Sequence, residues 1–476
     1  MNAEIIDSIR LQVSAKLDSK NKSQFGQFMT SSKIADHMAS LFDEKTHKPK
    51  LLDCGAGIGS LTLSAAKTLH DIQFIELWEI DPIMRTYLEK NIVSLGVPFR
   101  IHTADFIHSA VSFLLEKTGE RFTHAIINPP YKKISSHSEH KKTLRKVGIE
   151  TVNLYSAFLA LTIMLMEQNG QIVAIIPRSF CNGLYYKPFR TQLLKECSID
   201  HIHIFESRNK AFKDDDVLQE NIIIKLTKGK EQSDVVISLS HDQHFSDYQE
   251  KIVSFKDVVK EKDNERFIHI PVHEQVVLNS QLFSVGLKEL SISVSTGAVV
   301  DFRVKEYLKQ EPAENTVPLL YPHHFVNGEL IYPKQHKKPN ALRVAPETEK
   351  WLMPSDGFYV IVKRFSAKEE KKRVVAYLFN PNEIKATKIG FENHWNVFHS
   401  NKHGIDETLA RGLACFLNST GFDNCFRVFS GHTQVNATDL KNMQYPNFDV
   451  LDKLGHQYHP TMTQQQIDEL VAGIKE

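Results

Sequence analysis

The stretch Asn128-Pro129-Pro130-Tyr131 contains residue types that can bind a planar exocyclic amine. It follows the apolar run Ala125–Ile127, which we expect to be a buried strand. An amine conjugated to an aromatic ring is a weak nucleophile because its lone pair is delocalised, and two acceptors aimed at its hydrogens restore that lone pair. The side-chain oxygen of Asn128 and the main-chain carbonyl of Pro129 are suitable acceptors. The prolines fix φ at about −65°, and the ring of Tyr131 offers a stacking surface for a base.

A Pro-Pro pair also simply ends strands, and the four residues alone leave that alternative open. The upstream segment Leu51–Leu61 favours the chemical interpretation because it predicts a buried strand, a glycine-rich turn and a helix start. Asp53, Gly55 and Gly57 are its expected cofactor-binding residues. The glycines follow G-x-G-x-G, whereas a dinucleotide loop needs G-x-G-x-x-G to hold a pyrophosphate. S-adenosylmethionine has no phosphate, so the compact turn indicates this cofactor and a methyl transfer.

Acidic residues follow the next predicted strand, at the edge where a doubly wound sheet binds its ligands. Glu79 is the expected acceptor for the two ribose hydroxyls of the cofactor, and Ile80 is expected to pack on its adenine. The neighbouring Asp81 is an alternative acceptor. Because a proline follows it, Asp81 also fits the cap of a helix.

A third strand is predicted to close at Ala104–Ile107. Within it, Asp105 is expected to accept a hydrogen bond from the adenine amine of the cofactor, and Phe106 to stack on the ring. A single acid of this kind is more often a turn or cap residue than a ligand. A cofactor site is indicated because acidic residues follow successive strands, and parallel strands present their carboxyl ends at one edge of the sheet.

Taken in order, these motifs resemble the γ class of S-adenosylmethionine-dependent DNA adenine-N6 methyltransferases of type II restriction-modification systems. The segment Gln24–Ala35 resembles the N-terminal motif that touches the methionine end of the cofactor in this class, which assigns Gln27 and Thr30 to cofactor binding. Independently of the resemblance, one of the hydroxyl residues at positions 30–32 is expected to cap a helix that begins near Lys33.

Further segments extend the resemblance downstream. Asn153–Phe158 and Gly170–Pro177 are similar to the helix and strand that follow the catalytic motif in the class. Phe205–Lys213 resembles the segment that gives a second aromatic to the target-base pocket, and position assigns that role to Phe212. Similarity to target-recognition sequences extends over Ser295–Arg303, Tyr359–Phe365 and Ser430–Ala437.

The resemblance implies an α/β fold with a doubly wound, mostly parallel sheet, which is the Rossmann-like class I methyltransferase fold. We expect this catalytic domain in residues 1–275 and an α+β target-recognition domain in residues 276–476. The residues from about 225 to 266 are polar and predict irregular structure, with a hairpin or loop at Lys228–Asp234. Gln464–Lys475 predicts a closing helix.

The composition of the 476 residues, 41% hydrophobic and 24% charged, is typical of a soluble protein with two or three domains. No stretch is long and apolar enough for a bilayer, and the first twenty residues predict an amphipathic helix without a signal-peptide core. We therefore expect a cytoplasmic protein without a membrane partner. The five cysteines are too scattered for a zinc cluster, so we expect no metal and reduced thiols.

A net charge of +1 is low for a protein that binds DNA, so basic residues must be segregated. One basic group follows the catalytic motif: Lys132, Lys133, Lys141, Lys142, Arg145 and Lys146. Another lies in the C-terminal half: Lys334, Lys337, Lys338, Arg343, Lys363, Arg364, Lys368, Lys371, Lys372 and Arg373. A solvated face is the alternative explanation for each group.

The expected reaction is methyl transfer to an adenine that is flipped out of double-stranded DNA. Asn128 and Pro129 would hold its amine in the turn that Pro130 makes rigid, and Tyr131 and Phe212 would enclose its ring. Asn128 is also expected to contact the cofactor. No general base is needed, because the amine proton becomes acidic only after attack on the sulfonium. The mark would protect host DNA from a separate cognate restriction endonuclease. Alternatives are a protein-glutamine or RNA-base N-methyltransferase, and a non-catalytic DNA-binding protein on a degenerate methyltransferase fold.

Overall fold

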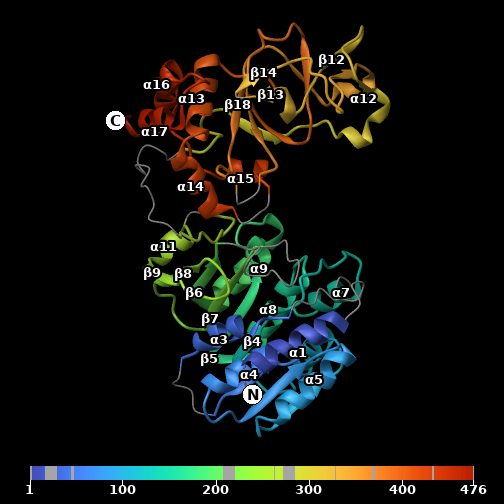
Figure 1. The fold of residues 1–476 in the computed structure, drawn as a ribbon, viewed down its shortest axis with the longest axis vertical. Coiled ribbons are helices and arrows are strands. Elements are labelled where there is room, and N and C mark those ends of the chain that lie inside the picture. The colour runs from blue at the N-terminus through green and yellow to red at the C-terminus, as the bar shows by residue number, and fades with distance from the viewer. Residues whose placement is uncertain are drawn as a thin grey trace. The chain divides into compact units, whose positions relative to one another are not determined.

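The computed structural model of the chain describes residues 3–16, 29–43, 48–206, 220–261, 263–271, 285–326, 328–366, 370–430 and 434–474. Gln27 and Phe212 lie outside these residues, so their roles stay predictions. The chain separates into two compact units, Met1–Val272 and His273–Glu476, which Figure 1 colours from blue to yellow-green and from yellow to red. Among the residues just given, no helix is both long and apolar enough to cross a lipid bilayer.

A nine-stranded sheet forms the centre of the first unit, in the order β3-β2-β1-β4-β5-β7-β6-β8-β9. Its strands are β1 Lys50–Asp53, β2 Phe74–Trp78, β3 Phe99–His102, β4 Phe122–Ile127, β5 Met166–Pro177, β6 Cys197–Phe205, β7 Asn221–Lys228, β8 Val235–Ser240 and β9 Gln249–Val253. Five of the eight pairings are parallel, and three are antiparallel. The predicted doubly wound, mostly parallel sheet is confirmed, with its switch in strand order between β1 and β4.

Helices cover both faces of this sheet because neighbouring residues of a strand point to opposite sides. Leu51 and Val173 pack with α3, α4 and α5, whereas their neighbours Leu52 and Ile172 pack with α6, α8 and α9. The helices of this unit are α1 Ala3–Lys16, α3 Ser32–Ser40, α4 Ser60–Thr68, α5 Pro82–Val93, α6 Phe106–Glu116, α7 Glu139–Arg145, α8 Leu154–Leu165, α9 Lys187–Glu196 and α11 Phe255–Val258, with the 3₁₀ turns η1 Arg178–Phe180 and η2 Leu184–Tyr186.

The sequence prediction of irregular structure between residues 225 and 266 is wrong. β7, β8 and β9 extend the sheet across most of this region. β6 lies between β7 and β8, so Lys228–Asp234 is a connecting loop and not a hairpin. The charges around Val235–Ile237 concealed a strand that pairs in parallel with β6, about thirty residues earlier in the chain. Local alternation carries no information about a partner at that separation.

The second unit combines small sheets with a helical C-terminal part. Its sheets have the orders β10-β20-β17-β18, β11-β15-β12-β19-β16 and β13-β14. The strands are β10 Ser293–Thr296, β11 Leu308–Lys309, β12 Thr316–Leu320, β13 Phe325–Val326, β14 Glu329–Leu330, β15 Ala341–Arg343, β16 Leu352–Pro354, β17 Tyr359–Lys363, β18 Ala376–Phe379, β19 Lys388–Phe391 and β20 Trp395–His399.

The helices of the second unit are α12 Pro346–Glu349, α13 Glu407–Leu417, α14 Thr420–Phe429, α15 Ala437–Lys441, α16 Phe448–Gln457 and α17 Gln464–Ala472, with the 3₁₀ turns η3 Asp301–Arg303, η4 Lys305–Tyr307 and η5 Pro322–His324. This mixture of sheets and helices agrees with the predicted α+β character. The closing helix is confirmed as α17, which ends three residues before the predicted Lys475.

A group of histidines lies between α3 and the sheet of the first unit. The ring of His203 on β6 packs in a tilted orientation against that of His37 of α3, with ring centroids 4.9 Å apart. Ser238 accepts or donates a hydrogen bond at 2.6 Å from His201 and 2.9 Å from His203. Burial lowers the pKa of His37 and His201 to about 4 and that of His203 to about 2. The folded protein therefore holds all three rings neutral at physiological pH.

We expect the contribution of these three histidines to the thermal unfolding midpoint to be constant above pH 7 and to fall below pH 6.5. An unfolded histidine has a pKa of about 6.5, so as the pH falls the unfolded chain binds protons that the folded chain cannot bind. Each histidine removes up to about 1.4 kcal/mol of stability per pH unit in that window. Relative to the wild type, His203→Gln should therefore gain stability as the pH falls from 7.5 to 5.5, whereas His70→Gln at an exposed site should not. A difference in midpoint between His203→Gln and the wild type that is the same at pH 5.5 and 7.5 would contradict the expectation.

Candidate active site

The glycine loop between β1 and α4 has a backbone that only glycine fits well. Gly57 and Gly59 have positive φ angles of 56° and 90°. A Cβ at Gly59 would lie 3.0 Å from Leu88 of α5, so a side chain there would be strained by conformation and crowded against α5. The amide of Ala56 donates to the carbonyl of Trp78 at 3.0 Å, which ties the loop to the end of β2.

Glu79 links the glycine loop to the segment after β2. One carboxylate oxygen accepts from the Gly57 amide at 2.8 Å, and the other accepts from the Asp81 amide at 2.7 Å. Burial raises the pKa of Glu79 to about 7, against the opposing effect of these two main-chain donors. Asp81 itself accepts from the amides of Ile83 and Met84 as the N-cap of α5. The cap interpretation of Asp81 is therefore confirmed.

Asp53 lies beneath the loop and is completely buried. One carboxylate oxygen accepts from the Thr62 hydroxyl at 2.7 Å, and the other has no hydrogen-bond partner among the described residues. Burial raises the pKa of Asp53 to about 7. Asp53 does not line the cavity above the loop, so its direct contact with a cofactor stays a prediction.

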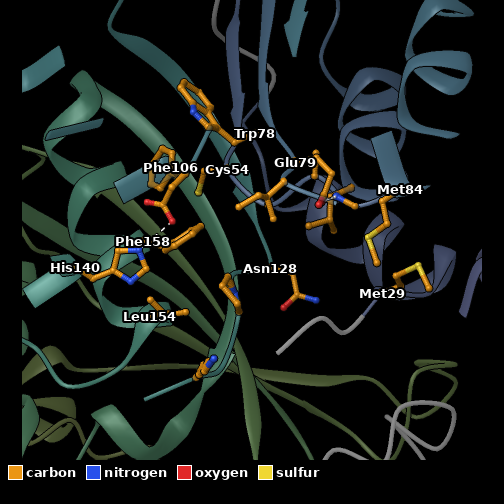
Figure 2. Close-up of a pocket in the computed structure, with 18 of the residues that line it drawn as sticks. Met29, Cys54, Trp78, Glu79, Met84, Phe106, Asn128, His140, Leu154 and Phe158 are labelled. Carbon is orange, nitrogen blue, oxygen red and sulfur yellow. Dashed lines mark hydrogen bonds and ion pairs between the residues drawn. The ribbon is translucent and has the colours of Figure 1, made fainter. Parts of the chain in front are cut away.

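A cavity of about 500 Å³ opens over the carboxyl ends of the parallel strands. Figure 2 shows the Asn128 amide between Leu154 and Phe158 on one side and Met29 and Met84 on the other. The wall also includes the predicted cofactor residues Thr30, Gly55, Gly57, Glu79, Ile80, Asp105 and Phe106, together with Pro130. Cavities of about 300–1,000 Å³ are typical of cofactor sites.

Asn128, directly after β4, is oriented by two hydrogen bonds. Its amide nitrogen donates to the Thr30 hydroxyl at 3.0 Å, and its oxygen accepts from the Tyr131 hydroxyl at 2.8 Å. Tyr131 also contacts the Ile175 carbonyl at 3.1 Å and does not line the cavity. Pro129 is buried and Pro130 half-buried. The turn therefore fixes the amide plane of Asn128 with partners from outside β4.

Thr30 precedes α3, and its hydroxyl contacts Asn128 instead of capping that helix. Ser31 occupies the cap position, but its hydroxyl donates to Gln243 at 2.9 Å. The prediction that a hydroxyl residue occupies the helix start is confirmed. The prediction that its side chain caps the helix is wrong, because the described hydrogen bonds include none from the Ser31 side chain to an amide of α3. The side chains of this turn serve long-range contacts.

Asp105 and Phe106 lie at the other end of the cavity. β3 ends at His102, so the prediction that residues 104–107 close this strand is wrong. Asp105 instead begins α6 as its N-cap and accepts from the His108 amide at 3.1 Å. Phe106 packs against Phe158, with ring centroids 4.9 Å apart. Both residues nevertheless line the cavity as predicted.

Several wall residues were not predicted from the sequence. Trp78 and Phe158 form an apolar wall around Phe106, and His140 of α7 contacts Asp105 at 3.0 Å. Trp78 immediately precedes Glu79, so its position at the strand end was a usable signal. Phe158 lies in the Asn153–Phe158 segment, which indicated a helix but no role. The sequence contained no signal for the pairing of His140 with Asp105.

Comparison with known proteins identifies the family. The Eco57I restriction-modification methylase model matches residues 62–212. The chain is 51% identical to the type II methyltransferase M.BsuBI of Bacillus subtilis, over 95% of this chain and 93% of that protein. It is 41% identical to the type II methyltransferase M.PstI of Providencia stuartii, over 98% of this chain and 96% of that protein. The chain belongs to the type II methyltransferase family.

Family membership confirms three predictions for this type II methyltransferase: the resemblance to restriction-modification methyltransferases, an enzymatic function, and S-adenosylmethionine as the cofactor. A solved structure shares the fold, namely the ATP-dependent type ISP restriction-modification enzyme LlaBIII bound to DNA. Its TM-score is 0.53 at 12% identity, covering 96% of this chain and 40% of that chain. The Rossmann-like class I fold is likewise confirmed.

The cavity fits S-adenosylmethionine by the chemistry of its wall. Ser60 and Trp78 belong to that wall, and the buried Ser60 hydroxyl and Trp78 indole N–H have no hydrogen-bond partner in the described part of the chain. Ile80 is 46% exposed at the wall, so its side chain is accessible for packing on a ring. The glycine loop leaves room for close approach of a ligand, and Glu79 offers acceptors for ribose hydroxyls.

Proposed function

We propose that this type II methyltransferase methylates the N6 amine of an adenine that is flipped out of double-stranded DNA. The orientation of Asn128 at the cavity wall is the observation that carries the proposal. Two hydrogen bonds fix its amide plane, so that an acceptor for an exocyclic amine exists before the base arrives. Preorganised acceptors of this kind contribute to catalysis because they need no rearrangement during the reaction. The bound S-adenosylmethionine supplies the methyl group.

The proposed acceptors are the Asn128 side-chain oxygen and the Pro129 carbonyl. The Tyr131 hydroxyl already donates to that Asn128 oxygen. A carbonyl oxygen has two lone pairs and can therefore accept from two donors, the Tyr131 hydroxyl and the amine of the base. In this proposal Tyr131 orients Asn128 through its hydroxyl and supports the base with its ring, and Phe212 covers the opposite face. The amine is the nucleophile, and its proton passes to water after methyl transfer.

For the glycine-loop side, we propose that Glu79 binds the ribose hydroxyls and that Ile80 and Phe106 enclose the adenine of the cofactor. Asp105 would accept from the cofactor's adenine amine. Gln27 and Thr30 would lie near its methionine end, and Asp53 would act beneath the Gly55–Gly57 turn. The wall positions of Glu79, Ile80, Asp105 and Phe106 support this arrangement.

We propose that the second unit reads the DNA sequence around the target. A main-chain bond there joins two of the segments whose sequences resemble target-recognition regions: Val435 donates to Arg364 at 2.8 Å. Val299, in the third such segment, donates to the Phe391 carbonyl of β19 at 3.1 Å. A Cβ at Gly297 would lie 2.2 Å from the Glu392 carbonyl, so the close approach of these two backbone segments requires glycine. The aromatic side chains Phe302 and Phe365 are 63% and 49% exposed, each with an arginine close to its ring. Exposed aromatic and cationic groups suit contact with nucleic acid.

Part of the predicted basic surface has structural partners instead. Arg373 is buried, and Lys338 forms an ion pair with Asp301. In the first unit, Lys141 and Arg145 share Glu150. Lys132 and Lys133 are exposed at the cavity wall, and we propose that this position brings them near the phosphates of the DNA. We further propose that the enzyme acts in the cytoplasm and protects DNA against a separate cognate endonuclease.

Single-molecule sequencing of genomic DNA from cells that express the enzyme tests the proposal. We expect N6-methyladenine at one short recurring motif, because a reading unit restricts methylation to few sites. Cells that express Asn128→Ala are the matched control and should lack the mark. Methylcytosine in place of methyladenine would overturn the choice of base. Absence of any DNA mark, with methyl transfer to RNA or a glutamine side chain in extracts, would overturn DNA as the substrate.

A further inference from the structure

The Asp105 carboxylate is held at both oxygens by groups from different elements. One oxygen accepts from the His108 amide at 3.1 Å, which is the helix-cap bond of α6. The other lies 3.0 Å from Nε2 of His140, a residue of α7 that is 35 positions away in the chain. Asp105 and His140 both line the cofactor cavity, and Figure 2 shows the His140 ring on the same side of that cavity as Phe106.

His140 is carried on a well-anchored element. Ser138 caps α7 by accepting from the Lys141 amide at 3.3 Å. The Lys141 ammonium contacts the Thr151 carbonyl at 2.9 Å and Glu150 at 2.6 Å. Leu144 of the same helix is completely buried in the core. The imidazole therefore approaches Asp105 from an element that is anchored to the Glu150–Thr151 segment and, through the Thr143 hydroxyl at 3.3 Å from His108, to α6 itself.

The pairing favours the charged form of both groups. The hydrogen bond to Asp105 raises the pKa of His140, against the effect of burial. Burial alone would raise the pKa of Asp105, but the bonds from His140 and the His108 amide outweigh it, and the pKa of this carboxyl is lowered. The carboxylate is thus an ionised acceptor in a partly desolvated wall, where hydrogen bonds to charged groups are strongest.

We propose that His140 is a positioning residue for the adenine of the cofactor: it holds the Asp105 carboxylate so that a remaining lone pair accepts from the 6-amino group. This inference rests on the proposed contact between Asp105 and that amine. Recognition of the amine excludes a purine with an oxygen at position 6, because two acceptors would then face each other without a proton between them. His140 would in this way determine the specificity of the site for adenosine over inosine.

Calorimetric binding of S-adenosylhomocysteine and S-inosylhomocysteine, with no DNA present, tests this role. We expect the wild-type enzyme to prefer the adenosine compound. We expect His140→Ala to reduce that preference about tenfold, mainly by weakening S-adenosylhomocysteine binding. His140→Gln retains an N–H donor and should restore part of the preference. His137→Ala, at an exposed position just before α7, is the matched control and should behave as wild type.

The outcomes separate the inference from the contact it rests on. Asp105→Asn should abolish the preference for adenosine. If Asp105→Asn removes the preference but His140→Ala leaves it intact, the role of His140 is refuted and the contact stands. If neither variant changes it, the contact itself is refuted. Equal weakening of both compounds by His140→Ala would indicate a purely structural role. None of these outcomes bears on which base of the target is methylated.

Discussion

Replacement of Asn128 by alanine should lower the rate of methyl transfer by about 100- to 1,000-fold, the usual effect of removing one preorganised polar group at a reacting centre. The amide makes its described bonds to Thr30 and Tyr131, which lie outside the glycine loop that we assign to the cofactor. S-adenosylhomocysteine binding should therefore be nearly unchanged. Single-turnover kinetics with radiolabelled cofactor and calorimetry on the same preparation measure the two quantities.

Thr30 provides a graded control for this prediction. Thr30→Val removes the acceptor for the Asn128 amide nitrogen while conserving shape. Thr30→Ser retains the hydroxyl. We expect the valine variant to be about tenfold slower and the serine variant to approach wild type. An Asn128→Ala enzyme that keeps most of its turnover would refute the proposed grip on the amine. A Thr30→Val enzyme at full rate would show that Tyr131 alone suffices to orient Asn128.

The parts of the site that could be predicted from the sequence are those that follow a strand directly. Glu79 and Asn128 come immediately after apolar runs, and parallel strands present their carboxyl ends at one edge of the sheet. Position along the chain therefore implies position in space for these residues. The glycines of the loop were predictable for a different reason. The positive φ angles at Gly57 and Gly59 strongly favour glycine, so the residue type itself indicates the turn.

The parts that could not be predicted depend on contacts between distant segments. The bond between Thr30 and Asn128 spans 98 positions, and the one between His140 and Asp105 spans 35. Neither leaves a periodicity in the sequence, because a single hydrogen bond constrains only one side chain on each element. Arg373 illustrates the opposite error. Within a run of basic residues it indicated a surface group, yet the structure buries it over the ring of Phe426.

Replacement of Glu79 by alanine should weaken S-adenosylhomocysteine binding by about 100-fold or more. The variant loses the proposed acceptor for two ribose hydroxyls, and each bond to a charged group contributes about 1.5–3 kcal/mol. It also frees the amides of Gly57 and Asp81, which Glu79 now holds at 2.8 and 2.7 Å. Asp81→Asn is the matched control. It retains the cap of α5, so its affinity should stay near wild type.

The pH dependence of binding isolates the charge of Glu79 from its shape. Its pKa of about 7 means that the free site is protonated below neutral pH. Ribose hydroxyls donate to the ionised form, so affinity should be constant above pH 7.5 and fall below pH 7, by at most about tenfold per pH unit. The same raised pKa makes the carboxylate destabilising for the fold as the pH rises from about 4.5 through 7, because burial disfavours its charge.

Glu79→Gln cannot ionise, so it should bind S-adenosylhomocysteine weakly, and the pH dependence of its binding should be removed. An affinity in the wild-type enzyme that does not change between pH 6 and 8 would exclude Glu79 as the ribose acceptor. The ribose would then have to be held by main-chain groups of the glycine loop.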